Sequence, residues 1–146
     1  MKRVLVVCVG NICRSPIGEA LLRRDLPTDF TIASAGISAM VDEPADDTMA
    51  AIAADHGLSL EAHRGQQFTK ALAAKFDLIL VMEPGHKREV TKLVPELSGR
   101  VMLFDHWEGG KGIADPYRRS QEFCEIVFSE ISKAASGWTT KLAGKR

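Results

Sequence analysis

Four short segments of the chain have the composition of buried β-strands. Val4–Val7, Leu78–Met82 and Val101–Phe104 are continuous apolar runs, and Phe30–Ser34 is a fourth candidate that stops just before Gly36. Runs without alternating polar positions are typical of strands that are covered on both faces. The pattern therefore predicts a parallel sheet buried between two layers of helices.

Segments with helical patterns separate these strands. We predict helices over residues 17–26, from Asp46 or Asp47 to Ala54, over 69–75 and over 84–94, with a last and longest helix within residues 117–146. The last segment has apolar residues at steps of three and four, namely Phe123, Val127, Ile131, Ala134, Trp138 and Leu142. Strands that alternate with helices indicate an α/β fold. We predict a single three-layer domain over residues 1–146, with a four-stranded parallel sheet and helices on both faces.

The composition narrows the classes of partner. Lys and Arg total 19 and Asp and Glu total 19, so no net charge attracts nucleic acid or an anionic membrane surface. No apolar run approaches the length of a membrane span, and we expect a cytoplasmic protein without membrane insertion. The three cysteines are odd in number and lack metal-ligand spacing, which argues against a disulfide framework and against zinc.

Candidate chemistry is concentrated in the segment that begins with Cys8, directly after the first predicted strand. A strand, a short turn and a helix would bring the thiol of Cys8, the guanidinium of Arg14 and a row of backbone N–H groups around one small anion. We expect Gly10 to allow the tight turn, Ser15 to cap the helix and Pro16 to be its first residue. The segment predicts a phosphate-binding loop with a thiol at its base.

The thiol of Cys8 is a candidate nucleophile. The thiolate is the reactive form of cysteine, and both a helix N-terminus and a neighbouring arginine favour it. The loop lacks the Gly-Lys-Ser/Thr ending of a nucleotide-binding loop, so no lysine follows to reach a terminal phosphate. The alternative is that Cys8 is only a small buried apolar side chain. The strand before it and the helix signals after it favour the nucleophile.

A second candidate lies in the loop between the last strand and the last helix, residues 109–117. This loop leaves the carboxyl end of a strand and can cover the same edge of the sheet as Cys8. A thiolate that displaces an alkoxide or a phenoxide from phosphorus needs an acid to protonate the leaving oxygen, and Asp115 is the candidate. Tyr117 is placed to line one side of a flat substrate. Taken alone, Asp115 would be an ordinary helix cap before Pro116.

Together these motifs resemble those of the low-molecular-weight protein tyrosine phosphatases. The resemblance covers nearly the whole chain, through the Cys8 loop, Ser34-Ala35-Gly36, Ala62-His63 and Asp115-Pro116-Tyr117. It implies a two-step hydrolysis of phosphotyrosine through a phosphocysteine, with no metal and no cofactor. It also implies that Cys8 is the nucleophile, Arg14 the phosphate clamp and Asp115 the general acid, and then the base that activates water.

The resemblance assigns three further groups of residues to the site. The residues of the phosphate-binding loop are Val9, Gly10, Asn11, Ile12, Cys13 and Ser15. The hydrogen-bond network that holds the loop in shape is Asn11, Ser15, Ser34 and His63. The rim that contacts the substrate is Met40, Val41 and Tyr117. Nothing in the spacing of the sequence singles out Ser34 or His63 by itself.

One part of the resemblance points to bacterial members. Eukaryotic members tend to have a second aromatic residue after the tyrosine of the acid loop and another on the facing wall, where this chain has Arg118 and the stretch Ala39–Val41. Residues 41–46 and 101–107 look more like bacterial members that act beside the tyrosine autokinases of capsule and exopolysaccharide export. The resemblance therefore implies a phosphotyrosine protein as substrate, in particular the phosphotyrosine tail of such a kinase.

Two other functions would use the same loop. An arsenate reductase would need further thiols to pass electrons onward, and only Cys13 and Cys124 accompany Cys8. A phosphate-binding regulatory module without turnover would be favoured by loss of Cys8, Arg14 or Asp115, all of which are present.

The remaining cysteines and histidines have simpler interpretations. Cys13 is either a filler of the loop or a thiol that traps oxidised Cys8 in a reversible disulfide. Cys124 is expected in the core of the last helix, and His86, early in a predicted helix, is expected to be solvated.

Overall fold

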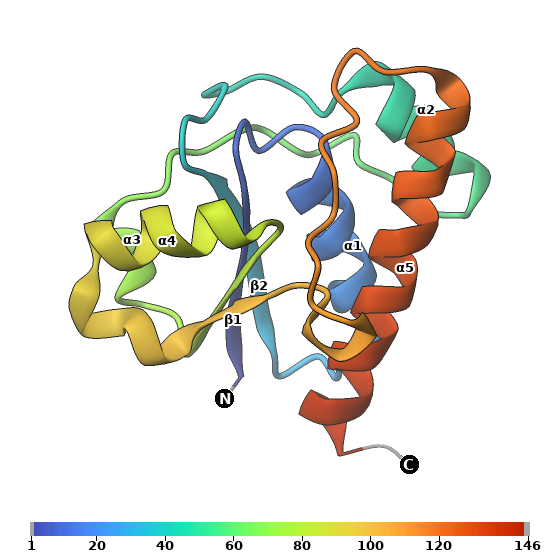
Figure 1. Ribbon diagram of the computed structural model, residues 1–146. Coiled ribbons are helices and arrows are strands. Elements are labelled where there is room, and N and C mark those ends of the chain that lie inside the picture. Colours follow the sequence, from blue (N-terminus) through green and yellow to red (C-terminus); the bar gives the residue numbers. More distant parts are fainter. Residues whose placement is uncertain (1, 145–146) are drawn as a thin grey trace.

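The computed structural model describes residues 2–144, and its centre is a single sheet (Figure 1). The four strands are β1 (Arg3–Cys8), β2 (Thr31–Gly36), β3 (Leu78–Val81) and β4 (Val101–Leu103), all parallel, in the order β2-β1-β3-β4. β1 pairs with both β2 and β3, so Cys8 ends a central strand. The predicted four-stranded parallel sheet is confirmed.

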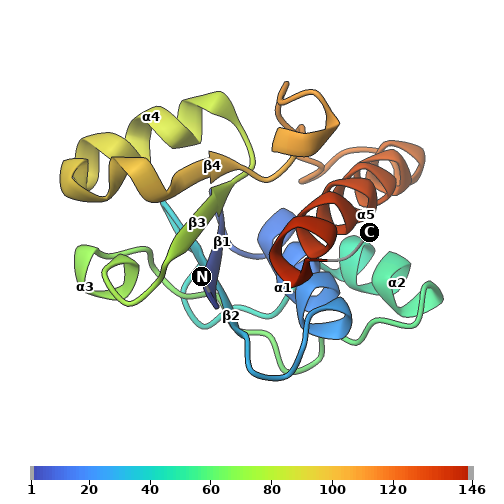
Figure 2. The same cartoon turned by 90° about the horizontal axis from the view of Figure 1, so that it is seen from below.

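Helices cover both faces of this sheet, as Figure 2 shows from below. On one face lie α1 (Arg14–Asp25), α2 (Asp47–Asp55) and α5 (Gln121–Ala143). On the other face lie α3 (Lys70–Ala73), α4 (Pro84–Leu93) and the 3-10 helix η1 (Pro95–Arg100). The predicted three-layer α/β architecture is therefore confirmed.

β1 is buried on both of its faces. Val4 and Val6 pack into the core on the α1 side, and Leu5 and Val7 pack into the core on the α4 side. Each of these four side chains is fully buried. Two buried faces require apolar residues at every position, which is why the strand is a continuous apolar run in the sequence.

The predicted boundaries are correct to within a few residues for most elements. Asp46 is the N-cap of α2, and its carboxylate accepts a hydrogen bond of 3.1 Å from the Met49 N–H. The second strand ends later than predicted, because Gly36 is not a stop signal but the last paired residue, opposite Cys8. Two short 3-10 helices, η1 and η2 (His106–Glu108), were not predicted at all.

The last helix starts later than predicted. α5 begins at Gln121, because Ser120 is its N-cap and accepts a hydrogen bond of 3.1 Å from the Phe123 N–H. Its predicted apolar stripe is the face turned to the core: Val127, Ile131, Ala134 and Trp138 are buried, and Phe123 and Leu142 are partly buried. Residues 145–146 of the predicted helix lie outside the described residues. No helix within residues 2–144 is long and apolar enough to cross a lipid bilayer.

The chain after β4 returns to the carboxyl edge of the sheet. The Phe104 N–H donates to the Val81 carbonyl at 2.7 Å, and the Ile113 N–H donates to the Met82 carbonyl at 2.8 Å. The indole N–H of Trp138 donates to the Phe104 carbonyl at 2.8 Å, which ties α5 to the same segment. These bonds bring the loop before α5 next to the loop that follows β1 (Figure 1).

Candidate active site

A small pocket lies where these two loops meet. It has a volume of about 180 Å³ and is lined by Cys8, Val9, Gly10, Ile12, Cys13, Arg14, Ser38, Met40, Asp115 and Tyr117. The β1–α1 loop therefore forms its floor, and the loop before α5 contributes the wall with Asp115 and Tyr117. Larger hollows elsewhere on the surface contain none of these three residues: Cys8, Arg14 and Asp115.

The loop turns at Asn11 rather than at Gly10. Asn11 has the left-handed backbone, with φ of 60°, whereas Gly10 does not have positive φ. Asparagine tolerates this conformation better than most residues, because its short amide can bond locally. The expectation that glycine freedom makes the turn was wrong, and the buried amide of Asn11 makes it instead.

The side chain of Asn11 holds the loop from inside. Its amide nitrogen donates to the hydroxyl of Ser15 at 2.7 Å and to the hydroxyl of Ser34 at 3.0 Å. Its amide oxygen accepts from the Gln66 N–H at 2.9 Å, and its backbone carbonyl lies 2.5 Å from Nε2 of His63. Three separate segments of the chain are thereby fixed to one loop residue.

Ser15 does not cap α1. The helix already begins at Arg14, with Cys13 as the N-cap residue and no side-chain cap bond, so the predicted cap role was wrong. The Ser15 hydroxyl instead lies 3.0 Å from the Cys8 sulfur. Because the oxygen of this hydroxyl accepts a hydrogen bond from the Asn11 amide, the hydroxyl hydrogen is free to point at the sulfur. That orientation places a hydroxyl hydrogen against the sulfur.

Glu19 completes the network and was not found from the sequence. The Ser34 hydroxyl donates to a carboxylate oxygen of Glu19 at 2.5 Å, and Glu19 forms an ion pair of 2.8 Å with Arg23 one helical turn later. With its hydrogen used for Glu19, the Ser34 hydroxyl can only accept from Asn11. The donor and acceptor roles therefore run in one direction, from Asn11 through Ser15 to Cys8. No motif distinguishes Glu19 from any other helical glutamate.

Arg14 is held under the pocket by partners on two other segments. Its guanidinium is 1% exposed, and Nη1 donates to Glu83 at 2.5 Å and to the Ile113 carbonyl at 2.6 Å. Nη2 lies 3.9 Å from Asp115, and Nε is buried with no hydrogen-bond partner among the described residues. One edge of the guanidinium is therefore fixed, and the edge with Nε and Nη2 is free for an oxyanion.

Glu83 was also missed by sequence reasoning. It lies two residues after the end of β3, at the same carboxyl edge of the sheet as Cys8, and is the N-cap residue of α4. A carboxylate at this edge is the only signal that could have identified it. Its role depends on Arg14, which lies 69 residues away in the chain.

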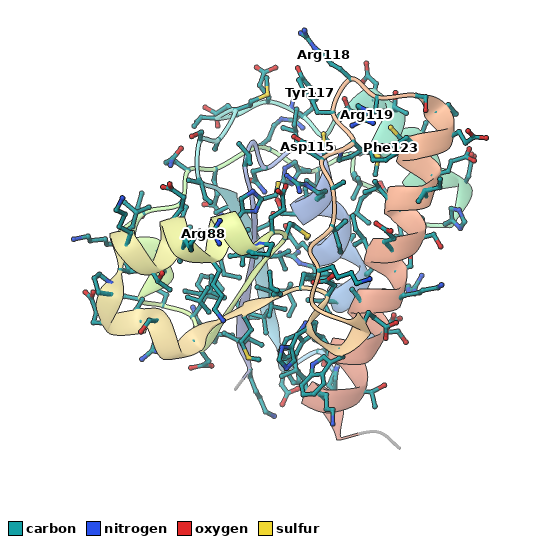
Figure 3. All side chains as sticks on the ribbon, viewed as in Figure 1. Arg88, Asp115, Tyr117, Arg118, Arg119 and Phe123 are labelled. Carbon is teal, nitrogen blue, oxygen red and sulfur yellow. The ribbon has the colours of Figure 1, made fainter. Side chains whose placement is uncertain are left out.

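Asp115 lies at the pocket wall and is not a helix cap. Its side chain is 49% exposed, and one carboxylate oxygen accepts from the Tyr117 N–H at 3.0 Å. Of the predicted rim, Met40 and Tyr117 line the pocket, while Val41 is exposed and does not line it. Figure 3 shows Asp115 and Tyr117 on the loop that leads to α5.

The two other cysteines are buried, as Cys8 is. Burial raises the pKa of the Cys13 thiol, and the nearby Asp46 carboxylate adds to that rise. Burial also raises the pKa of Cys124, whose sulfur lies 3.5 Å from the Pro116 carbonyl. Both thiols are therefore stabilised in the protonated, weakly nucleophilic form.

His86 is not solvated, contrary to expectation. It is 8% exposed, its Nδ1 has no hydrogen-bond partner among the described residues, and its Nε2 lies 3.6 Å from Glu83. Burial and the charge of Arg14 lower the pKa of His86. The sequence suggested an exposed helical position, but in the folded chain His86 is buried near Arg14 and Glu83.

A family model and the similar known proteins indicate the same protein family. The family model "Low molecular weight phosphotyrosine protein phosphatase" matches residues 3–146. The chain is 49% identical over 140 residues to the low molecular weight protein-tyrosine-phosphatase Etp of Escherichia coli, with 96% of this chain and 94% of Etp covered.

Two solved structures show how the fold is shared. The crystal structure of the tyrosine phosphatase Wzb from Escherichia coli, in complex with sulphate, matches with a TM-score of 0.94 and 48% identity, covering 97% of this chain and 98% of that one. The YwlE arginine phosphatase from Geobacillus stearothermophilus matches with a TM-score of 0.91 and 28% identity, covering 97% and 93%. From the family model and these relatives, the chain belongs to the low molecular weight phosphotyrosine protein phosphatase family.

Proposed function

We propose that this protein hydrolyses phosphotyrosine in proteins through a phosphocysteine intermediate, with residues 1–146 acting as one phosphatase domain. The observation that carries the proposal is that Asp115 lines the same pocket as Cys8 and Arg14, although it comes from a loop far from them in the chain. A thiol, a guanidinium with a free edge and an exposed carboxylate are the three groups that cysteine-dependent phosphoryl transfer requires.

In the first step the thiolate of Cys8 attacks phosphorus. A sulfur–phosphorus bond forms while the bond from phosphorus to the tyrosine oxygen breaks, and protonated Asp115 gives its proton to the leaving phenolate. Free tyrosine side chain leaves, and the phosphate remains on the sulfur. The exposed position of Asp115 at the pocket wall is consistent with reaching an oxygen that leaves toward solvent.

In the second step water replaces the sulfur. The carboxylate of Asp115 takes a proton from the water, whose oxygen attacks phosphorus, and the sulfur–phosphorus bond breaks. Inorganic phosphate and the Cys8 thiolate are released. The Ser15 hydroxyl, whose oxygen lies 3.0 Å from the sulfur, donates to that thiolate and stabilises it as a leaving group.

Arg14 is proposed to clamp the phosphoryl group. Its Nε has no hydrogen-bond partner among the described residues and Nη2 has only the 3.9 Å contact with Asp115, and two parallel hydrogen bonds from this edge of the guanidinium match two oxygens of a phosphoryl group. Glu83 and the Ile113 carbonyl keep the other edge from rotating. Backbone N–H groups of the loop from Val9 to Cys13 would complete the cradle.

The proposed substrate class is phosphotyrosine in a bacterial tyrosine autokinase of capsule or exopolysaccharide export, encountered in the cytoplasm. The support is the likeness to bacterial tyrosine phosphatases such as Etp and Wzb, together with the aromatic wall that Tyr117 gives the pocket. Neither arsenate reduction nor phosphate binding without turnover is favoured by these relatives.

The direct test is phosphate release from a phosphotyrosine peptide and from matched phosphoserine and phosphoarginine peptides, in the presence of a chelator. We expect release from the phosphotyrosine peptide only, and none from Cys8→Ser. In Asp115→Asn the rate should fall by about 10²- to 10⁴-fold for phosphotyrosine, and less for a nitrophenyl phosphate, whose leaving group needs no proton. Release from phosphoarginine instead, or no release from any peptide by folded protein, would refute the proposal.

A further inference from the structure

The tip of the loop before α5 carries Arg118, which forms no ion pair within residues 2–144. The Arg119 N–H donates to the Pro116 carbonyl at 3.0 Å, which closes a tight turn with Tyr117 and Arg118 at its centre. Arg118 takes the left-handed backbone conformation, with φ of 59°. In Figure 3 its side chain extends beyond the loop, above Tyr117 and Asp115.

Arg118 is held at the pocket mouth by Tyr117. Its guanidinium carbon lies 5.3 Å from the centre of the Tyr117 ring, and that ring lines the pocket. The ion pairs formed within residues 2–144 leave Arg118 without a carboxylate partner. The guanidinium therefore keeps its hydrogen-bond donors for a group outside this chain.

Two other arginines near the site already have partners. Arg14 is fixed by Glu83 at the pocket floor. The guanidinium carbon of Arg119 lies 4.2 Å from the centre of the Phe123 ring on α5, so this arginine is turned toward the helix. Of the two arginines that follow Tyr117, Arg118 is thus the one free to meet a bound substrate.

The opposite side of the pocket has a different character. Met40 lines it and Val41 is exposed beside it, and the next two residues, Asp42 and Glu43, are exposed acids. The chain as a whole has equal numbers of acidic and basic residues, so this asymmetry is local. A substrate with a negative group beside its phosphotyrosine is favoured on the Arg118 side and disfavoured on the side of the acids.

We propose that Arg118 determines specificity by binding an anionic group, a carboxylate or a phosphate, that flanks the phosphotyrosine of the substrate. This inference rests on the proposed function and names the kind of sequence that the site accepts. One to three residues of extended chain span up to about 10 Å, so a neighbouring side chain of the substrate comes within reach of the arginine. Arg118 contacts no reacting atom and is not a catalytic residue.

The test compares peptides that differ only beside the phosphotyrosine. One peptide has two Gln residues on each side, two others replace the pair on one side by Glu, and a fourth has one phosphoserine in place of a Gln. They are assayed with wild type, Arg118→Gln, Arg118→Glu and Arg88→Glu. Arg88 is an exposed arginine of α4 that Figure 3 places well away from Tyr117, so its variant has the same charge change at a distant site.

The expected readout is the ratio of kcat/KM for an anionic peptide to kcat/KM for the Gln peptide, measured with the same variant. In wild type and in Arg88→Glu this ratio should be about two to five for at least one Glu peptide, as for an exposed ion pair. It should fall to about one in Arg118→Gln and below one in Arg118→Glu. The change should lie in KM, because the contact is equal in the ground and transition states. At 1 M salt, where the Debye length is about 3 Å, the preference should vanish.

Several results separate the outcomes. A preference for the phosphoserine peptide alone identifies phosphate as the anion that is bound, and a preference for Glu identifies carboxylate. The inference would be overturned if wild type hydrolysed every anionic peptide with the same kcat/KM as the Gln peptide. It would also be overturned if the preference for an anionic peptide survived in both Arg118 variants. Loss of hydrolysis of every peptide by wild type would instead overturn the proposed function.

Discussion

Replacing Asn11 by alanine tests the claim that one buried amide shapes the phosphate-binding loop. The substitution removes the hydrogen bonds to Ser15 and Ser34 and the one from the Gln66 N–H. Each contributes about 1 kcal/mol net, so their sum is about 3 kcal/mol. Alanine must also adopt φ of 60°, which adds about 1 kcal/mol. We expect Asn11→Ala to lower the free energy of unfolding by about 4 kcal/mol, a large part of the 5–15 kcal/mol typical of a domain.

Asn11→Gly is the matched control, because glycine loses the same three hydrogen bonds but has no left-handed penalty. Its loss should be about 3 kcal/mol, so the glycine variant should be more stable than the alanine variant by about 1 kcal/mol. At an ordinary helix or strand position the order would be reversed. Both variants should lose about 10- to 100-fold in kcat, since Ser15 is no longer oriented toward Cys8.

The measurement is urea unfolding at equilibrium, with the slope against denaturant checked to be unchanged between variants. A loss of less than about 1 kcal/mol in Asn11→Ala would show that other contacts hold the loop. An alanine variant more stable than the glycine variant would refute the assigned backbone strain.

Three further predictions concern neighbouring groups. Because burial and Arg14 lower the pKa of His86 in the folded state, the unfolded chain binds more protons below about pH 6.5. Between pH 7.5 and pH 5.5 the free energy of unfolding should fall more in wild type than in His86→Gln, as measured by urea unfolding. An equal fall in the two proteins would contradict this effect of burial. Gly36→Ala would place a Cβ 2.5 Å from the Val9 carbonyl, so it should destabilise by about 1–3 kcal/mol and reduce activity, whereas Gly99→Ala, with no atom within 4 Å, should do neither. Iodoacetamide at neutral pH should alkylate Cys8 in the native protein and spare Cys13 and Cys124, whose pKa values are raised. Mass spectrometry of the digested protein would measure the labelling of each cysteine. Equal labelling of all three cysteines would contradict this prediction.

Much of this protein can be predicted from its sequence because the relevant signals are local. The continuous apolar runs at β1, β3 and β4 identify strands buried on both faces, and the helical period of α5 identifies its buried face. The thiol, the turn and the helix start of the phosphate-binding loop lie within a few residues of each other. The fold class and the proposed nucleophile therefore follow from short stretches of chain.

Features that depend on contacts between distant segments cannot be predicted from local sequence. Glu83 reaches Arg14 across 69 residues, and Ser34 lies between Asn11 and Glu19 only because β2 pairs with β1. Ser15 is a local case, because its hydroxyl bonds to Asn11 and Cys8, only four and seven residues away, rather than to the helix end that the capping preference suggested.

The physical cause of this division is the range of the interactions involved. Strand and helix patterns reflect the burial of each residue and its neighbours, which the sequence records directly. Hydrogen-bond partners, burial of polar groups such as His86 and the orientation of a guanidinium depend on which side chains the fold brings within about 3 Å. Short stretches of sequence are enough to place the reactive groups at the carboxyl ends of the strands, whereas the pairing of these groups follows from the folded chain.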